Sequence, residues 1–155
     1  MPFVTMPKVI QFTNGMKILD LMPGGYNLEY VSMLFRTLGE EGRHNYLFYQ
    51  IPVGMVFPLL FAITNCLLIA LFLKKLKQFK TPFIYLCFLP FIGGVADYGE
   101  NIEIILMLNQ FPDITGLAVK ITSFFSIVKY SFIIVSFVVI LILLIAVGMK
   151  YNRKK

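Results

Sequence analysis

Three long apolar runs dominate this sequence and limit the folds that are open to it. They cover residues 49–73, 82–108 and 117–147, and a helix needs about 20 apolar residues to cross a hydrocarbon core of about 30 Å. The chain is 58% apolar and 14% charged, with a mean hydropathy of +0.79. Because lipid offers no hydrogen-bond partner to the backbone, such runs cross a membrane as helices. We therefore predict an all-α integral membrane helical bundle with three transmembrane helices, built as one membrane domain over residues 1–155.

The first 48 residues differ from the rest because they contain no apolar run of spanning length. Within them an extramembrane amphipathic helix is predicted over residues 27–38, with Asn27 as its N-cap after the Gly24–Gly25 pair. This helix either packs on the rest of the protein or lies in the lipid interface, and both alternatives stay open. Residues 39–44 are predicted to form a hydrophilic turn before the first span. Thr81 and Pro82 are predicted to open the second span as its N-cap and N1 residues.

Basic residues are concentrated in two segments, which predicts the orientation of the chain. Residues 74–81 and the basic tail, residues 148–155, hold eight of the 14 lysines and arginines and none of the eight acids. By the positive-inside rule both segments lie in the cytoplasm, so residues 1–48 and 109–116 lie outside. The expected location is a bacterial cytoplasmic membrane with a cytoplasmic C-terminus. The expected partners of the basic segments are anionic lipid headgroups rather than nucleic acid.

Four motifs spread over most of the chain carry a resemblance. They are LDLMPGGY at residues 19–26, LGEEGR at 38–43, FPLLF at 57–61 and ADYGEN at 96–101. Together they resemble a family of small, uncharacterised integral membrane proteins. The resemblance implies a bundle of three to four transmembrane helices, since relatives often carry one more apolar helix ahead of the first motif. It implies no activity, cofactor or ligand.

The second span carries carboxylates that are out of place in a lipid-facing helix. On a helical projection Asp97, Glu100 and Asn101 share one face with Gly93 and Gly94, whereas Glu103 projects elsewhere. The glycines permit another helix to approach closely. A charged side chain near the bilayer centre costs at least about 2.5–3.5 kcal/mol on insertion scales. This face is therefore predicted to be paired, protonated or hydrated.

Lys129 on the third span is the predicted partner of these carboxylates. It lies on a face that also carries Ser126, and it lies about as deep in the membrane as Glu100, roughly 12 Å at helical rise. The set of Asp97, Glu100 and Lys129 carries a net charge of −1 if all three ionise, which a proton or another cation would balance. Asn65 in the first span is predicted to bond another helix. The secondary candidates are Ser126, together with Arg43 and His44 just outside the membrane.

The polar residues admit two interpretations, and three functions remain open. They either form a network that fixes helix packing or line a functional site, which is the usual role of buried intramembrane ionisable groups. In the first function, the polar residues form a pocket that binds or handles a lipid-like or small amphiphilic ligand or an ion. As an enzyme, the chain uses Asp97 or Glu100 as acid–base groups on a lipophilic substrate. As a structural or accessory subunit, it assembles with other helices through Gly93 and Gly94, and a homo-oligomer is one such assembly.

The sequence contains no recognised catalytic motif, and no cofactor is predicted. The chain has one histidine, which does not support a histidine-based metal site, and no metal is predicted. Cys66 and Cys87 lie inside apolar runs without a CxxC spacing, so both are predicted to be buried free thiols.

Overall fold

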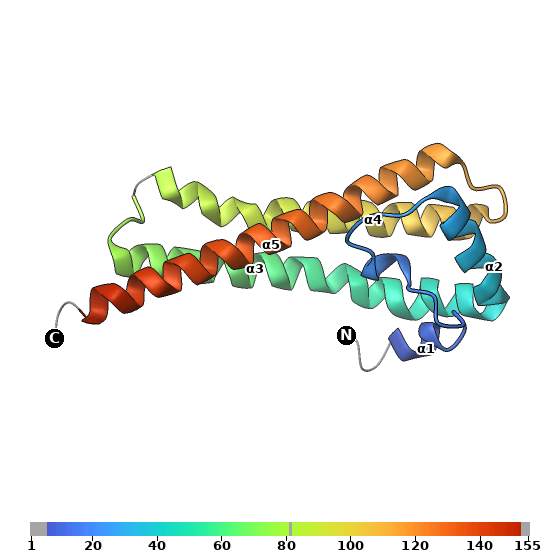
Figure 1. Ribbon diagram of the computed structural model, residues 1–155, viewed down its shortest axis with the longest axis horizontal. Helices are drawn as coiled ribbons and strands as arrows, with labels where there is room; N and C mark the ends of the chain where they lie inside the picture. Colours follow the sequence, from blue (N-terminus) through green and yellow to red (C-terminus); the bar gives the residue numbers. More distant parts are fainter. Residues whose placement is uncertain (1–5, 81, 153–155) are drawn as a thin grey trace.

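The protein is an elongated bundle of three long helices, with a smaller helical layer at one end (Figure 1). The computed structural model describes residues 6–80 and 82–152. The N-cap predicted at Thr81 and the last three residues of the basic tail lie outside these ranges. In chain order the elements are α1 (Met6–Ile10), η1 (Leu19–Leu21), α2 (Leu28–Asn45), η2 (Tyr46–Gln50), α3 (Ile51–Leu76), η3 (Pro82–Phe88), α4 (Leu89–Gln110) and α5 (Gly116–Asn152).

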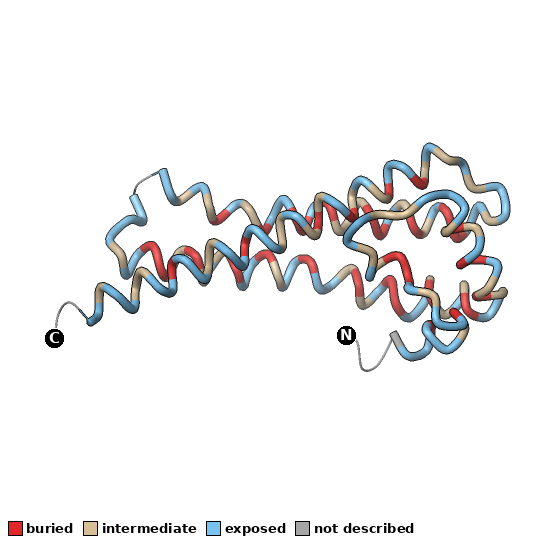
Figure 2. The backbone as a smooth tube through the Cα atoms, viewed as in Figure 1, coloured by how far each residue is buried: buried red, intermediate tan, exposed pale blue. Residues whose placement is uncertain are grey.

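The predicted helical class is confirmed, since the described ranges contain helices and no strand. Among the residues that the structure describes, three helical segments are long and apolar enough to cross a membrane: Leu28–Leu76, Pro82–Gln110 and Gly116–Asn152. Many large apolar side chains along them are exposed, and Figure 2 shows that much of the surface of α5 is exposed. Exposed apolar surface on this scale is unfavourable in water but matches a lipid environment. The architecture is thus compatible with an integral membrane protein.

The boundary between α2 and the first span differs from the prediction. Residues 40–44 are helical, so the predicted hydrophilic turn is wrong. The helix is interrupted inside α2 at Gly39, whose φ of 64° and ψ of −172° are not helical, and glycine tolerates a positive φ at no steric cost. One near-continuous helical stretch therefore leads from α2 through η2 into α3.

The amphipathic helix α2 packs on the protein, as the first of the two alternatives for it predicts. Asn27 is its N-cap, as predicted, because the Asn27 side chain accepts a 2.9 Å hydrogen bond from the Tyr30 N–H. The apolar face of α2 is buried in a cluster with the N-terminal segment and the end of α4. Its members include Val9, Leu19, Phe35 and Met107, all fully buried. Residues 6–26 are thereby attached to one end of the bundle.

Two glycines of α4 allow the three long helices to approach one another closely. A Cβ on Gly93 would lie 3.2 Å from Phe132 Cβ on α5, and a Cβ on Gly94 would lie 3.3 Å from the Pro58 carbonyl oxygen on α3. The prediction of close helix approach at these positions is confirmed. Because both glycines are buried inside the chain's own bundle, they offer no surface for assembly with another subunit.

Candidate functional site

The candidate site is a buried acidic cluster between α4 and α5, made of Asp97, Glu100, Asn101, Ser126 and Lys129. Lys129 forms ion pairs with Glu100 Oε2 and with Asp97 Oδ1, the latter at 3.4 Å. The side chains of Lys129, Asp97 and Glu100 are 6%, 14% and 0% exposed. The predicted pairing across the two helices is therefore confirmed. Lys129 is paired with two carboxylates. If all three groups are ionised, the set therefore carries one negative charge that Lys129 does not balance.

Glu100 is surrounded by donors on both of its oxygens. Oε2 accepts from Lys129, and Oε1 accepts from the Ser126 hydroxyl and, at 3.3 Å, from the Tyr26 hydroxyl. Burial, followed by the nearby Glu100 carboxylate, raises the pKa of Tyr26 well above its usual range, which keeps the phenol protonated and able to donate. A fully buried carboxylate with three donors is held in one position.

Asn101 holds Asp97 in place but leaves one of its own atoms without a partner. Its Nδ2 donates to the Asp97 carbonyl oxygen at 2.9 Å and to Asp97 Oδ1 at 3.1 Å. This fixes the orientation of the amide, because the opposite orientation would place two acceptors against each other. Among the described residues, Asn101 Oδ1 is buried without a hydrogen-bond partner. It faces Gly54 on α3, where an added Cβ would lie 3.2 Å away.

The loop before α2 covers the cluster from outside the bundle. The backbone N–H of Tyr26 donates to Ser123 Oγ at 2.9 Å, and this bond directs the Tyr26 ring toward Glu100. The preceding residue must be glycine on two grounds. Gly25 has a φ of +77°, and a Cβ at this position would lie only 2.3 Å from Ser123 Oγ. The loop can therefore approach α5 only without a side chain at position 25.

A second set of contacts fixes the same loop through Asp20. Tyr46 donates to Asp20 Oδ2 at 2.6 Å, and Tyr130 on α5 donates to the Asp20 carbonyl oxygen. Tyr130 in turn lies beside the cluster, since the Lys129 ammonium is 5.0 Å from its ring centroid. The Asp20 carboxylate itself is bound to the Tyr46 hydroxyl and interacts electrostatically with Lys129. Its placement increases the surplus of negative charge at this end of the bundle.

Several predicted candidates lie elsewhere. Asn65 donates to the Phe61 carbonyl oxygen of its own helix at 2.8 Å, so the prediction of a bond to another helix is wrong. Arg43 donates to the Phe35 carbonyl oxygen at 2.9 Å and packs over the Phe111 ring, while His44 is exposed against Phe48. These contacts place Arg43 and His44 in the helical layer around α2 rather than in the cluster. Glu103 is half-buried and is not among the partners of Lys129.

Sequence reasoning did not find the two N-terminal members of the site, Asp20 and Tyr26. Both lie in the LDLMPGGY motif, which carries part of the family resemblance but no local signal that identifies α5 as the contact. The Gly24–Gly25 pair is the one signal in the sequence that points to a close contact here. Glycine often occurs where the backbone approaches another element closely, so the pair could have predicted that the loop before Tyr26 packs against a helix.

Removal of the Tyr26 hydroxyl tests its place in the cluster. Tyr26→Phe is expected to lower the free energy of unfolding by about 1 kcal/mol, because Glu100 loses one donor while the ring is kept. Chemical unfolding of the purified protein in mixed micelles measures this. Tyr85→Phe is the matched control, since Tyr85 is 70% exposed; equal effects of the two variants would contradict the described role of Tyr26.

The described residues include no group of three or more His, Cys, Asp or Glu side chains placed to hold a metal ion. The site therefore consists of two carboxylates, Asp97 and Glu100, that share Lys129. The amide oxygen of Asn101 lies next to them without a hydrogen-bond partner within the described ranges. Comparisons with protein-family models, with curated proteins and with solved structures find no match to this chain.

Proposed function

We propose that this chain is a small polytopic membrane protein that binds one positive charge at its acidic cluster, either as a proton or as the ammonium group of a small amphiphile. The observation that carries the proposal is the charge balance around Lys129. One lysine is shared by the buried Glu100 and the partly exposed Asp97, and Asp20 adds a further negative charge that acts on Lys129. Uncompensated charge in a low-dielectric interior costs several kcal/mol, so binding of a cation is favoured.

The surroundings of Asp97 support it as the carboxylate that takes up the charge. Glu100 is fully buried and has donors on both oxygens, whereas Asp97 is partly exposed and meets Lys129 at a longer distance. A donor arriving at Asp97, such as an ammonium group, would be bound by the carboxylate, because Asn101 already donates to Asp97 through Nδ2 and directs its Oδ1 toward Gly54.

Access to the cluster is proposed to be controlled by the loop that carries Asp20 and Tyr26. At Tyr26 this loop is held over the cluster by hydrogen bonds to Ser123 and Glu100, which are easier to open than the packing of three long helices. Its other end is anchored by Leu19 in the apolar cluster. An enzyme that uses Glu100 as its acid or base is less well supported, because a substrate would have to reach a carboxylate that is completely buried.

Infrared spectroscopy of the protein in lipid nanodiscs tests the proposal. If the charge is a proton, a protonated carboxyl band is expected at neutral pH, and it should disappear in Asp97→Asn and persist in the control Glu103→Gln. If the charge is an ammonium group, the band is absent, and mass spectrometry of the denatured protein should detect a released amine in the wild type but not in Asp97→Asn. Absence of both signals would refute the proposal.

The orientation of the chain is part of the same proposal. The end of α3, the start of η3 and the end of α5 lie at one end of the bundle, and α2 lies at the other (Figure 1). With the basic end in the cytoplasm, the loop over the cluster faces the opposite side of the membrane.

Cysteine labelling in intact cells checks this orientation. In a background with Cys66 and Cys87 replaced by alanine, Lys77→Cys is expected to react with a membrane-impermeant maleimide only after lysis. Asp113→Cys, at the other end of the bundle, is expected to react without lysis. The reverse pattern would contradict the proposed orientation.

A further inference from the structure

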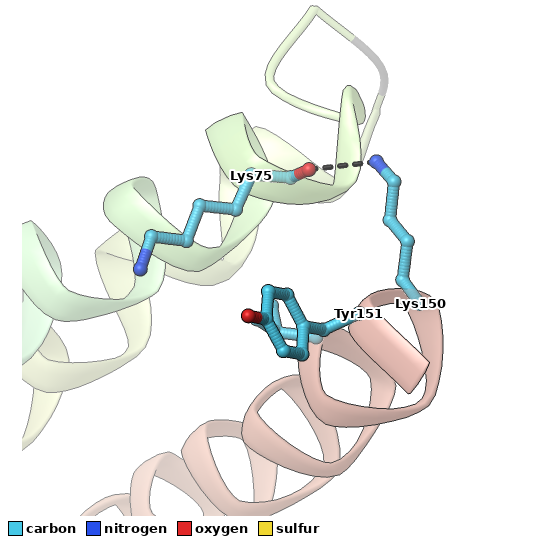
Figure 3. A pocket seen from close by; sticks show the side chains of 4 residues that line it. Lys75, Lys150 and Tyr151 are labelled. Atoms are coloured by element: carbon cyan, nitrogen blue, oxygen red, sulfur yellow. Dashed lines mark hydrogen bonds between the residues drawn. The ribbon is translucent and has the colours of Figure 1, made fainter. Parts of the chain in front are cut away.

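The basic end of the bundle contains a pocket that is separate from the acidic cluster. It lies between the last turns of α3 and α5, has a volume of about 250 Å³, and is lined by Lys75, Val147, Lys150 and Tyr151. Figure 3 shows these side chains around it, with Lys75 contributed by α3 and the other residues by α5. We propose that this pocket binds the phosphate of an anionic phospholipid.

The position of the pocket favours a lipid over a soluble ligand. It lies at the ends of two apolar segments that are long enough to cross a membrane, which is the level of the headgroups. Val147 lies one helical turn before Tyr151, on the side of the pocket nearer to the apolar part of α5, where an acyl chain would lie. Tyr151 is 65% exposed, and tyrosine is enriched at this level of membrane proteins.

The charge around the pocket is complementary to a phosphate. Lys74, Lys75, Lys77, Lys80 and Lys150 all lie at this end, and neither residues 74–80 nor residues 147–152 contain an acid. Helix C-termini carry partial negative charge, which alone would repel an anion. Here the Lys150 ammonium donates to the Lys75 carbonyl oxygen at 2.7 Å, so one of the terminal carbonyls of α3 is already neutralised by a cation.

The bond between Lys150 and Lys75 also preorganises the site. An ammonium group has three donors, and the bond to Lys75 uses one of them while it fixes the position of the nitrogen. The other two remain for phosphate oxygens. The Lys75 ammonium points away from that of Lys150 (Figure 3), so it adds positive charge around the pocket rather than a second bond beside Lys150. Because the two residues come from different helices, a bound headgroup would hold the ends of α3 and α5 together.

Native mass spectrometry of the full chain in detergent tests this, with phosphatidylglycerol as the anionic probe and phosphatidylcholine as the zwitterionic one. The double variant Lys75→Gln/Lys150→Gln is expected to bind phosphatidylglycerol about tenfold more weakly, because the bonds from Lys150 to the phosphate and the nearby charge of Lys75 are both lost. The matched double variant Lys74→Gln/Lys80→Gln removes the same net charge outside the pocket and is expected to change binding less than twofold.

Two further measurements make the outcome decisive. Inorganic phosphate should not displace the lipid at concentrations that saturate a simple anion site, because it lacks the acyl chains that contact Val147. Tyr151→Phe should keep the preference for the anionic lipid. Equal weakening in the two double variants, or equal binding of the two lipids by the wild type, would overturn the proposal. The test involves no residue of the acidic cluster, so its outcome is independent of the proposed function.

Discussion

Lys129→Met is expected to lower the free energy of unfolding by about 3–5 kcal/mol. The substitution keeps most of the side-chain volume but removes the cation that both Asp97 and Glu100 contact. Loss of one partner from a buried ion pair leaves the remaining charge without compensation, which accounts for the size of the effect. Unfolding of the purified protein in mixed micelles measures the change.

Two variants show whether this loss comes from the carboxylates. Lys120→Met makes the same change at an exposed position of α5 and is expected to stay within about 0.5 kcal/mol of the wild type. Adding Glu100→Gln to Lys129→Met is expected to restore part of the lost stability, because the neutral amide no longer needs the cation. A double variant with the summed loss of the two single variants would contradict a direct interaction.

Gly25→Ala is expected to detach the loop that covers the acidic cluster. An alanine there has to adopt a φ of +77°, and its Cβ would lie 2.3 Å from Ser123 Oγ. Strained backbone alone costs about 1–3 kcal/mol, and relief of the overlap requires the Tyr26 N–H to leave Ser123. Hydrogen exchange of residues 19–26 should therefore accelerate strongly, and the global free energy of unfolding should fall by at least about 1–3 kcal/mol.

The neighbouring glycine provides the control for this experiment. A Cβ on Gly24 meets no atom within 4 Å, and its φ is not positive. Gly24→Ala is therefore expected to leave the exchange of residues 19–26 unchanged or slower, since alanine restricts the unfolded chain. If the two alanine variants behaved alike, the close approach at Gly25 would not be what holds the loop.

The helical class and the central ion pair could be predicted from sequence because each depends on a strong local signal. Long apolar runs predict spanning helices whatever their partners, and a lysine in one span needs a carboxylate in another. Asp97, Glu100 and Lys129 were identified on that basis. Gly93 and Gly94 were also predicted to allow close helix approach, and both lie between helices of the same chain.

The remaining parts of the site depend on tertiary placement, which no local pattern encodes. Tyr26 and Asp20 contact α5 across 100 or more positions of the chain. Asn65 was assigned to another helix because an amide in a span needs a partner, but a carbonyl one turn earlier in its own helix satisfied it. Residues 40–44 were predicted as a turn from their polarity, but they continue the helix on its exposed side.

The ion pair between α4 and α5 also bears on how the chain enters the membrane. During synthesis α4 emerges first, with Asp97 and Glu100 but without Lys129, which follows 29 positions after Glu100. Inserted alone, α4 would place two carboxylates in lipid without a counterion. The connection between the two helices, residues 111–115, is short. We therefore expect α4 and α5 to leave the translocon together as a helical hairpin, with the ion pair formed before either helix contacts lipid.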